Sequence, residues 1–101
     1  MTITDITPRI EARDGVAVTV YTKNDCWGCT KTKGLLDRAE IEYTAVNVEE
    51  DEPAFHYVTD TLGYRQMPVV VTSTPEGEFV WSGLQPHKIR EHITHRAEAA
   101  A

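Results

Sequence analysis

The sequence predicts an α/β domain built on a four-stranded mixed sheet. Two apolar runs rich in β-branched residues, at positions 16–21 and 69–71, have the character of buried strands. A helical pattern and another strand follow the first run, whereas turn residues and another strand follow the second. The resulting order β-α-β-α-β-β-α, with short connections, gives a right-handed parallel βαβ unit and then a hairpin.

The first half of the chain supplies a strand, a helix and a second strand. These are expected at residues 16–22, 28–39 and 42–48. The helix carries three apolar residues at helical spacing on one face: Leu35, Leu36 and Ala39. We therefore expect this face to pack on the sheet.

The second half supplies two helices with a hairpin between them. The first of these helices begins at Glu52-Pro53, since proline is tolerated in a first helical turn, and it ends at Gly63. Its apolar stripe is expected to consist of Ala54, Phe55, Val58 and Leu62. The hairpin strands and the last helix are expected at residues 68–72, 78–81 and 86–95, with Ile89 and Ile93 facing the core.

Burial requirements fix the arrangement of these elements. The continuous apolar strands belong in the middle of the sheet, and helices must cover both of its faces. The expected architecture is therefore a sheet of order 2-1-3-4 flanked by three helices, which is the thioredoxin fold. We expect this domain to span residues 16–101, and residues 1–15 to form a flexible N-terminal extension interrupted by Pro8.

Composition narrows the functional class. The 101 residues fit one small domain, and 41% hydrophobic with 26% charged residues is typical of a globular protein. The net charge of −6 argues against a nucleic-acid partner, and no stretch approaches the roughly 20 apolar residues of a membrane helix. The N-terminus lacks the pattern of a signal peptide, so we expect a cytoplasmic protein. In that compartment a catalytic dithiol is more usual than a structural disulfide. We also expect the protein to be a monomer.

Charge is distributed unevenly along the chain. Residues 16–39 carry four basic and two acidic side chains, which gives +2, whereas residues 40–60 carry seven acidic side chains and no lysine or arginine. Lysines on a helix face are usually only solvated. The alternative is that they steer an acidic partner segment toward this part of the molecule.

A pair of cysteines lies where the first strand ends and the first helix begins. Cys26 and Cys29, the two cysteines of the chain, are separated by Trp27 and Gly28. Free N–H groups and the helix dipole favour an anion at a helix N-terminus, and a thiolate is such an anion. Because residues i and i+3 share a helix face, the two sulfurs can form and break a disulfide. We expect the more exposed Cys26 to attack a disulfide and Cys29 to resolve the intermediate.

Three other interpretations of the cysteine pair are weaker. A zinc site needs two more ligands, and the candidates His92 and His95 have too short a spacing for a zinc-binding histidine pair. An inert disulfide that closes so short a loop would stabilise the fold little. Two unrelated core thiols are not expected at the junction between a strand and a helix.

The four histidines are expected to be solvated on helix surfaces: His56, His87, His92 and His95.

Several residues near the cysteines are candidates for contact with a partner. An aromatic side chain beside a nucleophile suits docking, although Trp27 could instead pack on a neighbour. Pro68 has a sufficient structural explanation at the first position of a strand. The functional alternative is that it shapes a loop beside Cys26 and leaves the Met67 backbone free to pair with an extended peptide. Trp81 fits the core better than a binding surface.

Three stretches together resemble the NrdH-redoxins, which are glutaredoxin-like in sequence and thioredoxin-like in behaviour. They are residues 26–29 (CWGC), 63–70 (GYRQMPVV) and 81–89 (WSGLQPHKI). The resemblance covers about residues 16–93, and its Trp-Ser-Gly stretch is the most specific part. It implies redox cysteines at Cys26 and Cys29 and a cis-proline at Pro68.

The resemblance implies a small electron carrier with no bound cofactor and no metal. Such a protein is reduced by thioredoxin reductase, with NADPH as the ultimate donor, and reduces the disulfide of class Ib ribonucleotide reductase. Glutaredoxins that use glutathione hold it with a Gly-Gly pair and acidic residues beyond, whereas residues 81–86 contain no acidic side chain. Partner contacts are expected at seven residues: Lys23, Trp27, Met67, Pro68, Trp81, Ser82 and Gly83.

Two departures from the family pattern leave rival functions open. Trp27-Gly28 stands where relatives more often carry Val or Met followed by Gln, and Leu84-Gln85 replaces the usual Phe-Arg. One rival is a glutaredoxin- or mycoredoxin-type reductase of mixed disulfides that uses a low-molecular-weight thiol. The other is a non-catalytic module that binds a metal or an iron–sulfur cluster through the cysteine pair.

Overall fold

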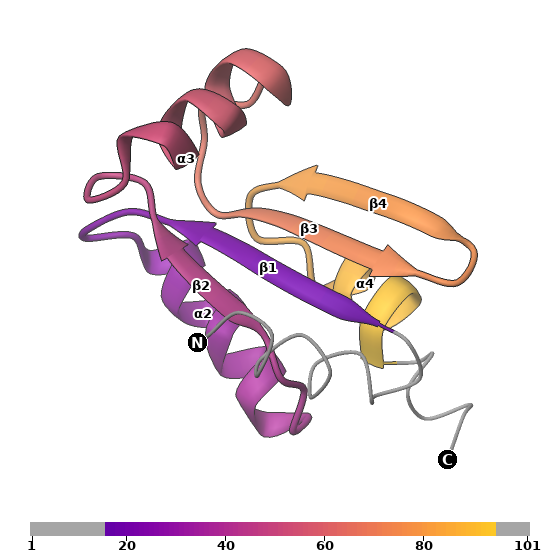
Figure 1. Cartoon of the computed structure of the whole chain (residues 1–101). Helices are drawn as coiled ribbons and strands as arrows, with labels where there is room; N and C mark the ends of the chain where they lie inside the picture. The colour runs from indigo at the N-terminus through magenta and orange to yellow at the C-terminus, as the bar shows by residue number, and fades with distance from the viewer. Residues whose placement is uncertain (1–15, 95–101) are drawn as a thin grey trace, which may run out of the picture.

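A computed structural model of the chain describes residues 16–94 and shows one sheet with helices on both of its faces (Figure 1). The strand order β2-β1-β3-β4 confirms the predicted order 2-1-3-4. The predicted N-terminal extension, and the end of the chain beyond Thr94 with His95, lie outside the described residues. No helix within the described part is long and apolar enough to cross a membrane.

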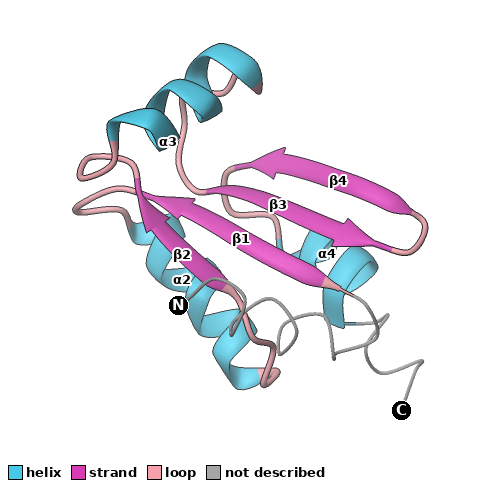
Figure 2. Cartoon of the chain, viewed as in Figure 1, coloured by secondary structure: helices cyan, strands magenta, loops and turns pink. Residues whose placement is uncertain are grey.

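The strands follow the predicted segments closely (Figure 2). Their bounds are β1 Ala17–Thr22, β2 Thr44–Asn47, β3 Val69–Thr74 and β4 Gly77–Ser82. β1 pairs with β2 in parallel and with β3 in antiparallel orientation, and β3 pairs antiparallel with β4. The pair Thr74 and Gly77 closes the hairpin, where the Thr74 hydroxyl donates to the Gly77 carbonyl oxygen at 3.0 Å. The parallel unit followed by a hairpin is thus confirmed.

Two of the helical regions change their winding partway along. The first helix, α2, spans Trp27–Arg38 and is regular. The second begins as α3, Glu52–His56, and continues as a π-helical turn η1, Tyr57–Thr61. The last begins as α4, Pro86–Ile89, and continues as the π-helical turn η2, Arg90–Thr94. Each π turn holds more residues than an α turn, so the side chains after it point in other directions than a regular helix would give.

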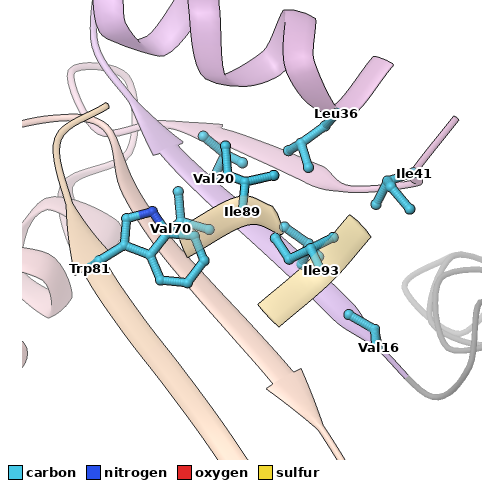
Figure 3. Close-up of a cluster of buried hydrophobic side chains, with 9 residues drawn as sticks. Val16, Val20, Leu36, Ile41, Val70, Trp81, Ile89 and Ile93 are labelled. Carbon is cyan, nitrogen blue, oxygen red and sulfur yellow. The ribbon is translucent and has the colours of Figure 1, made fainter. Parts of the chain in front are cut away.

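One hydrophobic core lies between the sheet and the helices α2 and α4 with η2 (Figure 3). Leu36 of α2 and Ile93 of η2 are fully buried against Val20 and Val70 from the two central strands. Successive residues of a strand face opposite sides, so alternate valines of β1 and β3 supply this core. The predicted inward positions of Leu36, Ile89 and Ile93 are confirmed.

A second core covers the opposite face of the sheet, under α3 and η1. Val58 of η1 and Val69 of β3 are fully buried there. Cys29 belongs to this cluster together with Met67, so the end of the sheet that carries the cysteines is anchored in packed apolar residues. Interiors packed in this way hold side chains in fixed positions.

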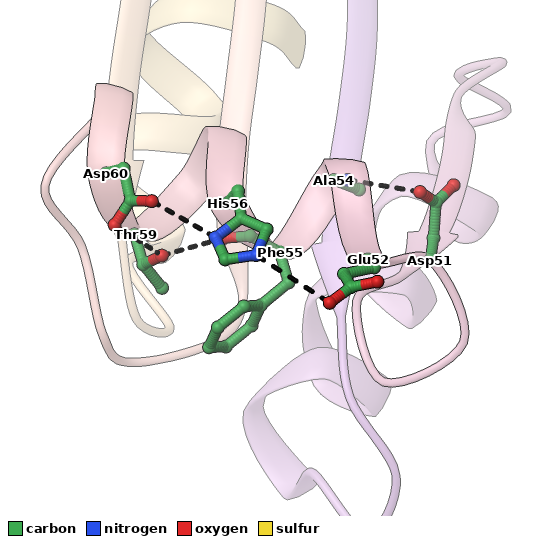
Figure 4. A network of polar contacts seen from close by, with 7 residues as sticks. All are labelled: Asp51, Glu52, Ala54, Phe55, His56, Thr59 and Asp60. Atoms are coloured by element: carbon green, nitrogen blue, oxygen red, sulfur yellow. Dashed lines mark hydrogen bonds and ion pairs between the residues drawn. The ribbon is translucent and has the colours of Figure 1, made fainter.

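The apolar stripe predicted for the second helix is wrong at Phe55. Its side chain is exposed and its ring meets that of His56 edge-on. Asp51 is the N-cap of this helix, and its side chain accepts the Ala54 N–H at 3.0 Å (Figure 4). The other three predicted positions, Ala54, Val58 and Leu62, do pack in the second core, together with Tyr57, which was not predicted there.

His92 is also misplaced by the sequence-based prediction. The imidazole side chain is only 15% exposed and stacks on the Phe79 ring at 4.1 Å between centroids, with Trp81 at 5.8 Å. Phe79 and Trp81 alternate along β4 and so share one face of the sheet, which gives a flat aromatic surface for the ring. His56 and His87 are exposed, as predicted.

Candidate active site

The two cysteines lie at the carboxyl end of β1, in the turn that leads into α2. Asp25, in the left-handed region at φ 52°, turns the chain, and Cys26 follows in an extended conformation as the N-cap of the helix. The Cys26 sulfur accepts the Cys29 N–H at 3.2 Å. The two sulfurs form a disulfide, with 5.2 Å between the Cα atoms. The local geometry therefore places the Cys26 sulfur on one of the free N–H donors of the helix N-terminus.

The two sulfurs differ in accessibility. Cys29 is 2% exposed within the second core, whereas Cys26 is only partly buried. An incoming sulfur must approach the disulfide along its axis from an open side, and the Cys26 side is the open one. This asymmetry agrees with the predicted difference in exposure between the two residues.

The loop before β3 lies against the cysteine pair. The Met67–Pro68 peptide bond is cis, as the family resemblance implies. The Met67 carbonyl oxygen lies 3.7 Å from the Cys26 sulfur, and both Met67 and Pro68 are buried. Two segments more than forty residues apart in the sequence thus meet at the disulfide.

The segment after β4 holds that loop in place. Ser82 donates its hydroxyl to the Gln66 carbonyl oxygen at 2.6 Å, and Gly83 donates its N–H to the Pro68 carbonyl oxygen at 2.7 Å. Gly83 has φ +86°, which glycine adopts without steric cost. Ser82 and Gly83, predicted to contact a partner, are therefore bonded to the loop that faces the disulfide.

Gly28 allows the loop to come close. A Cβ atom at this position would lie 3.3 Å from Cδ of Pro68 and 3.7 Å from Cβ of Leu84. A side chain here would have to push the proline away from α2. Sequence alone does not identify this contact, because the two residues are forty positions apart.

Trp27 projects from the first turn of α2 beside Cys26. It is 70% exposed, so the prediction that it could pack on a neighbour is wrong for most of its surface. The ammonium group of Lys31 lies 5.6 Å from the centre of the indole, one helical turn along. Sequence alone does not single out Lys31 as part of this region, although the i, i+4 spacing from Trp27 is the available signal.

Trp81 lies inside the molecule. It is 3% exposed in the first core, and its indole nitrogen has no hydrogen-bond partner among the described residues. A side chain buried in this way does not reach a partner, so its predicted place among the docking residues is not supported. Lys23 is exposed in the loop before Cys26, where the neighbouring Asn24 accepts a hydrogen bond from the Asn47 side chain at 2.9 Å.

Tyr21, the penultimate residue of β1, packs under the site. Its ring lies 5.8 Å from that of Tyr57 in η1. Burial raises the pKa of Tyr21 above its usual 10.0, with smaller contributions from Tyr57, Asp51 and Glu78. The phenol is thus held in its neutral form more firmly than in water.

Metal-ligating side chains do not gather near the cysteines. Within residues 16–94 no group of three or more histidine, cysteine or acidic residues is arranged to hold a metal ion. His92, one half of the histidine pair considered for zinc, stacks on Phe79 in the first core, and the other half, His95, lies outside the described residues.

Comparison with known proteins gives consistent matches. The profile of the glutaredoxin family matches residues 18–79. The chain is 37% identical to the glutaredoxin-like protein NrdH of Salmonella typhimurium, a match covering 84% of this chain and all of that protein. It is 40% identical to the gene 56 protein of Mycobacterium phage L5, over 75% of this chain and 71% of that protein. The solved NrdH-redoxin of Escherichia coli superimposes with a TM-score of 0.66 at 32% identity, covering 74% of this chain and 92% of that one.

Proposed function

The chain belongs to the NrdH-type branch of the glutaredoxin family and is a thiol–disulfide oxidoreductase, and we propose that it carries electrons from NADPH-dependent thioredoxin reductase to class Ib ribonucleotide reductase. The observation that carries the proposal is the asymmetry of the cysteine pair. One sulfur is accessible at a helix N-terminus, and the other is buried next to it.

The proposed reaction proceeds in two exchange steps. The Cys26 thiolate attacks one sulfur of the partner disulfide, and the other partner sulfur leaves as a thiolate that takes up a proton. Cys29 then loses its proton and attacks the Cys26 sulfur, which releases the second partner thiol. Two electrons pass to the partner, and the Cys26–Cys29 disulfide seen in the structure is the oxidised product.

The backbone around the disulfide has a specific role in this scheme. The Cys29 N–H, which contacts the Cys26 sulfur at 3.2 Å, would stabilise its thiolate, and the helix dipole adds to this effect. Cys29 needs only a short movement to reach the mixed disulfide, because the sulfurs are already neighbours. No further group is required to store the electrons, so we propose a protein without a bound cofactor.

Two observations favour thioredoxin reductase as the electron donor. The solved E. coli NrdH-redoxin is described as having a thioredoxin-like activity profile. Residues 81–86 lack the acidic side chains expected of a glutathione site. We propose that the protein is a monomer and acts in the cytoplasm. In that compartment thioredoxin reductase and NADPH keep such dithiols reduced.

A coupled assay tests the electron donor. Purified protein is incubated with thioredoxin reductase, NADPH and insulin, and NADPH oxidation is followed by absorbance. We expect turnover that depends on this protein and is lost in the Cys26→Ser variant. Turnover with glutathione or mycothiol and their reductases, but not with thioredoxin reductase, would instead assign the protein to the low-molecular-weight-thiol class.

A trapping experiment tests the roles of the two sulfurs. The Cys29→Ser variant should accumulate a mixed disulfide with the large subunit of class Ib ribonucleotide reductase through Cys26, whereas the Cys26→Ser variant should not. Peptide mapping by mass spectrometry identifies the linked cysteine. Capture through Cys29 instead would reverse the assignment.

A further inference from the structure

We propose that Trp27 and Lys31 form a docking surface that selects disulfides flanked by acidic residues. This inference rests on the proposed function, because it concerns the segment of a partner protein that reaches Cys26. The occupant is an extended segment that carries an aspartate or glutamate close to its cysteine. Trp27 contributes apolar contact area, and Lys31 contributes charge.

Trp27 has the properties of a contact residue and lacks those of a structural one. It is the largest exposed apolar side chain described in the molecule, at 70% exposure. It immediately follows Cys26, so a segment whose sulfur reaches Cys26 comes close to the indole. Tryptophan is enriched among the residues that dominate binding energies, because it buries a large area with few rotatable bonds.

Lys31 gives this surface a positive charge. Its ammonium group lies 5.6 Å from the centre of the Trp27 ring, so the two side chains lie together on one stripe of α2. Within residues 16–94 no ion pair joins Lys31 to a carboxylate, and the cation is exposed. A carboxylate from a partner can therefore pair with Lys31 without displacing an internal salt bridge.

The charges around Cys26 favour an acidic segment on the α2 side. Lys23 adds a second exposed cation in the loop before the cysteine. The acidic run 49–52 follows β2 and leads into α3, and the hydrogen bond that Asn24 accepts from Asn47 ties the end of β2 to the same loop. Asp25 adds one negative charge next to Cys26. Exposed cations near Cys26 attract a partner carboxylate, whereas Asp25 and the acidic run 49–52 repel it from the loop before the cysteine. We therefore expect the carboxylate to pair with Lys31, which is on α2 and not in that loop.

The test uses pre-reduced full-length protein and two synthetic peptides, each closed by an internal disulfide. The peptides differ only at the two residues beside one cysteine, Asp-Asp in one and Lys-Lys in the other. The second-order rate constant for peptide reduction is measured in a single turnover, so that no reductase is needed. We expect the acidic peptide to react about fivefold faster at low salt and the difference to shrink at high ionic strength.

Charge reversal separates a local effect from the overall charge of the protein. Lys31→Glu should abolish or invert the preference for the acidic peptide. Lys33→Glu makes the same change in net charge on the same helix, two residues away, and should leave the preference as in the unmodified protein. Trp27→Ala should lower the rate constants for reduction of both peptides more than the rate constant for bis(2-hydroxyethyl) disulfide, which is too small to contact the indole. Trp27→Phe should recover part of this loss.

The outcomes distinguish this proposal from the one on which it rests. Equal rate constants for the two peptides, or equal changes of the ratio in the Lys31 and Lys33 variants, would overturn the docking surface while leaving the dithiol chemistry in place. If neither peptide nor the small disulfide oxidises the pre-reduced protein, the proposed function itself is wrong.

Discussion

At the scale of single residues, the cysteine loop depends on a conformation that few residue types adopt. Asp25 has φ 52°, a region in which a β-carbon crowds the following carbonyl and which asparagine and aspartate enter more readily than other residues. The turn brings Cys26 out of the strand direction and onto the start of α2. The residue that shapes this loop also carries a negative charge beside the Cys26 sulfur, so its two effects can be separated by substitution.

The Asp25→Asn variant should increase the reactivity of Cys26. Asparagine tolerates the left-handed conformation, while the loss of the carboxylate removes a like charge that opposes the thiolate. One such interaction in water is worth less than about 1 kcal/mol, so alkylation of reduced protein at pH 6 should become about two- to fivefold faster. Iodoacetamide labelling followed by mass spectrometry measures the rate at each cysteine.

A matched variant controls for the backbone effect. Asp25→Ala removes the same charge but places a less tolerant residue at φ 52°, so it should also lower the free energy of unfolding by about 1 kcal/mol. If Asp25→Asn left the alkylation rate unchanged, the carboxylate would have no electrostatic influence on Cys26.

At the scale of elements, the order of strands and helices follows from simple patterns, whereas their winding does not. Alternation, β-branched runs and turn residues locate all four strands and the start of each helix. The π turns at Tyr57–Thr61 and Arg90–Thr94 were not predicted, because the apolar spacing of the sequence does not distinguish a π turn from an α turn. Phe55 and His92 are misassigned because apolar spacing does not fix how far a helical region is rotated toward the sheet. The pairing of Phe79 with Trp81 on one strand face is the signal that could have identified the position of His92.

The short helix α3 should be sensitive to its cap. Asp51→Ala removes the acceptor of the Ala54 N–H and should lower the free energy of unfolding by about 1 kcal/mol. Asp51→Asn keeps a capping oxygen, so it should lower the free energy of unfolding by only a few tenths of that amount. Urea denaturation measures both, and an equal loss in the two variants would attribute the effect to charge rather than to capping.

The packing of Tyr21 between β1 and η1 predicts that the stability of the fold depends on pH above pH 10. Burial, followed by Tyr57, Asp51 and Glu78, raises the pKa of Tyr21 above 10.0, so the folded state prefers the neutral phenol. The stability that this preference contributes is fully present below pH 10 and is lost as the pH rises through the folded-state value. The free energy of unfolding should therefore fall as the pH rises above 10.

Substitution identifies the group responsible. Tyr21→Phe should reduce the slope of unfolding free energy against pH in this window, as measured by urea denaturation at several pH values. Tyr43, whose pKa is raised by burial and by Asp37, contributes in the same direction, so part of the slope should remain. An unchanged slope in Tyr21→Phe would contradict the assignment.

At the scale of the whole molecule, two separate cores hold the sheet, and the cysteine pair touches only one of them. Short connections and burial on both faces were sufficient to predict the topology, because few arrangements satisfy both. The site could be predicted as far as the cysteines and the cis-proline, the latter from family resemblance. The contacts of Gly28 with Pro68 and of Lys31 with Trp27 could not be predicted from the sequence, since they depend on helix rotation and on segments distant in sequence.

This organisation predicts that the reduced protein remains folded. The disulfide closes a loop of four residues, for which the chain-entropy estimate is about 2 kcal/mol, whereas a domain of this size is typically stable by about 5–15 kcal/mol. Urea denaturation with and without dithiothreitol should show a difference of at most about 2 kcal/mol. Loss of cooperative unfolding on reduction would show that the disulfide is structural.

Because Cys26 is the N-cap of α2, the stability of the first turn of this helix depends on whether the cysteine pair is oxidised or reduced. A reduced, ionised sulfur places a full negative charge at that terminus, and an oxidised one places none, so the first turn is reinforced each time the pair accepts electrons. Reciprocity of coupled equilibria then requires that anything which frays this turn also makes the reduced form harder to maintain. Substitutions in the first turn of α2 should thus shift the balance between oxidised and reduced protein without altering either sulfur.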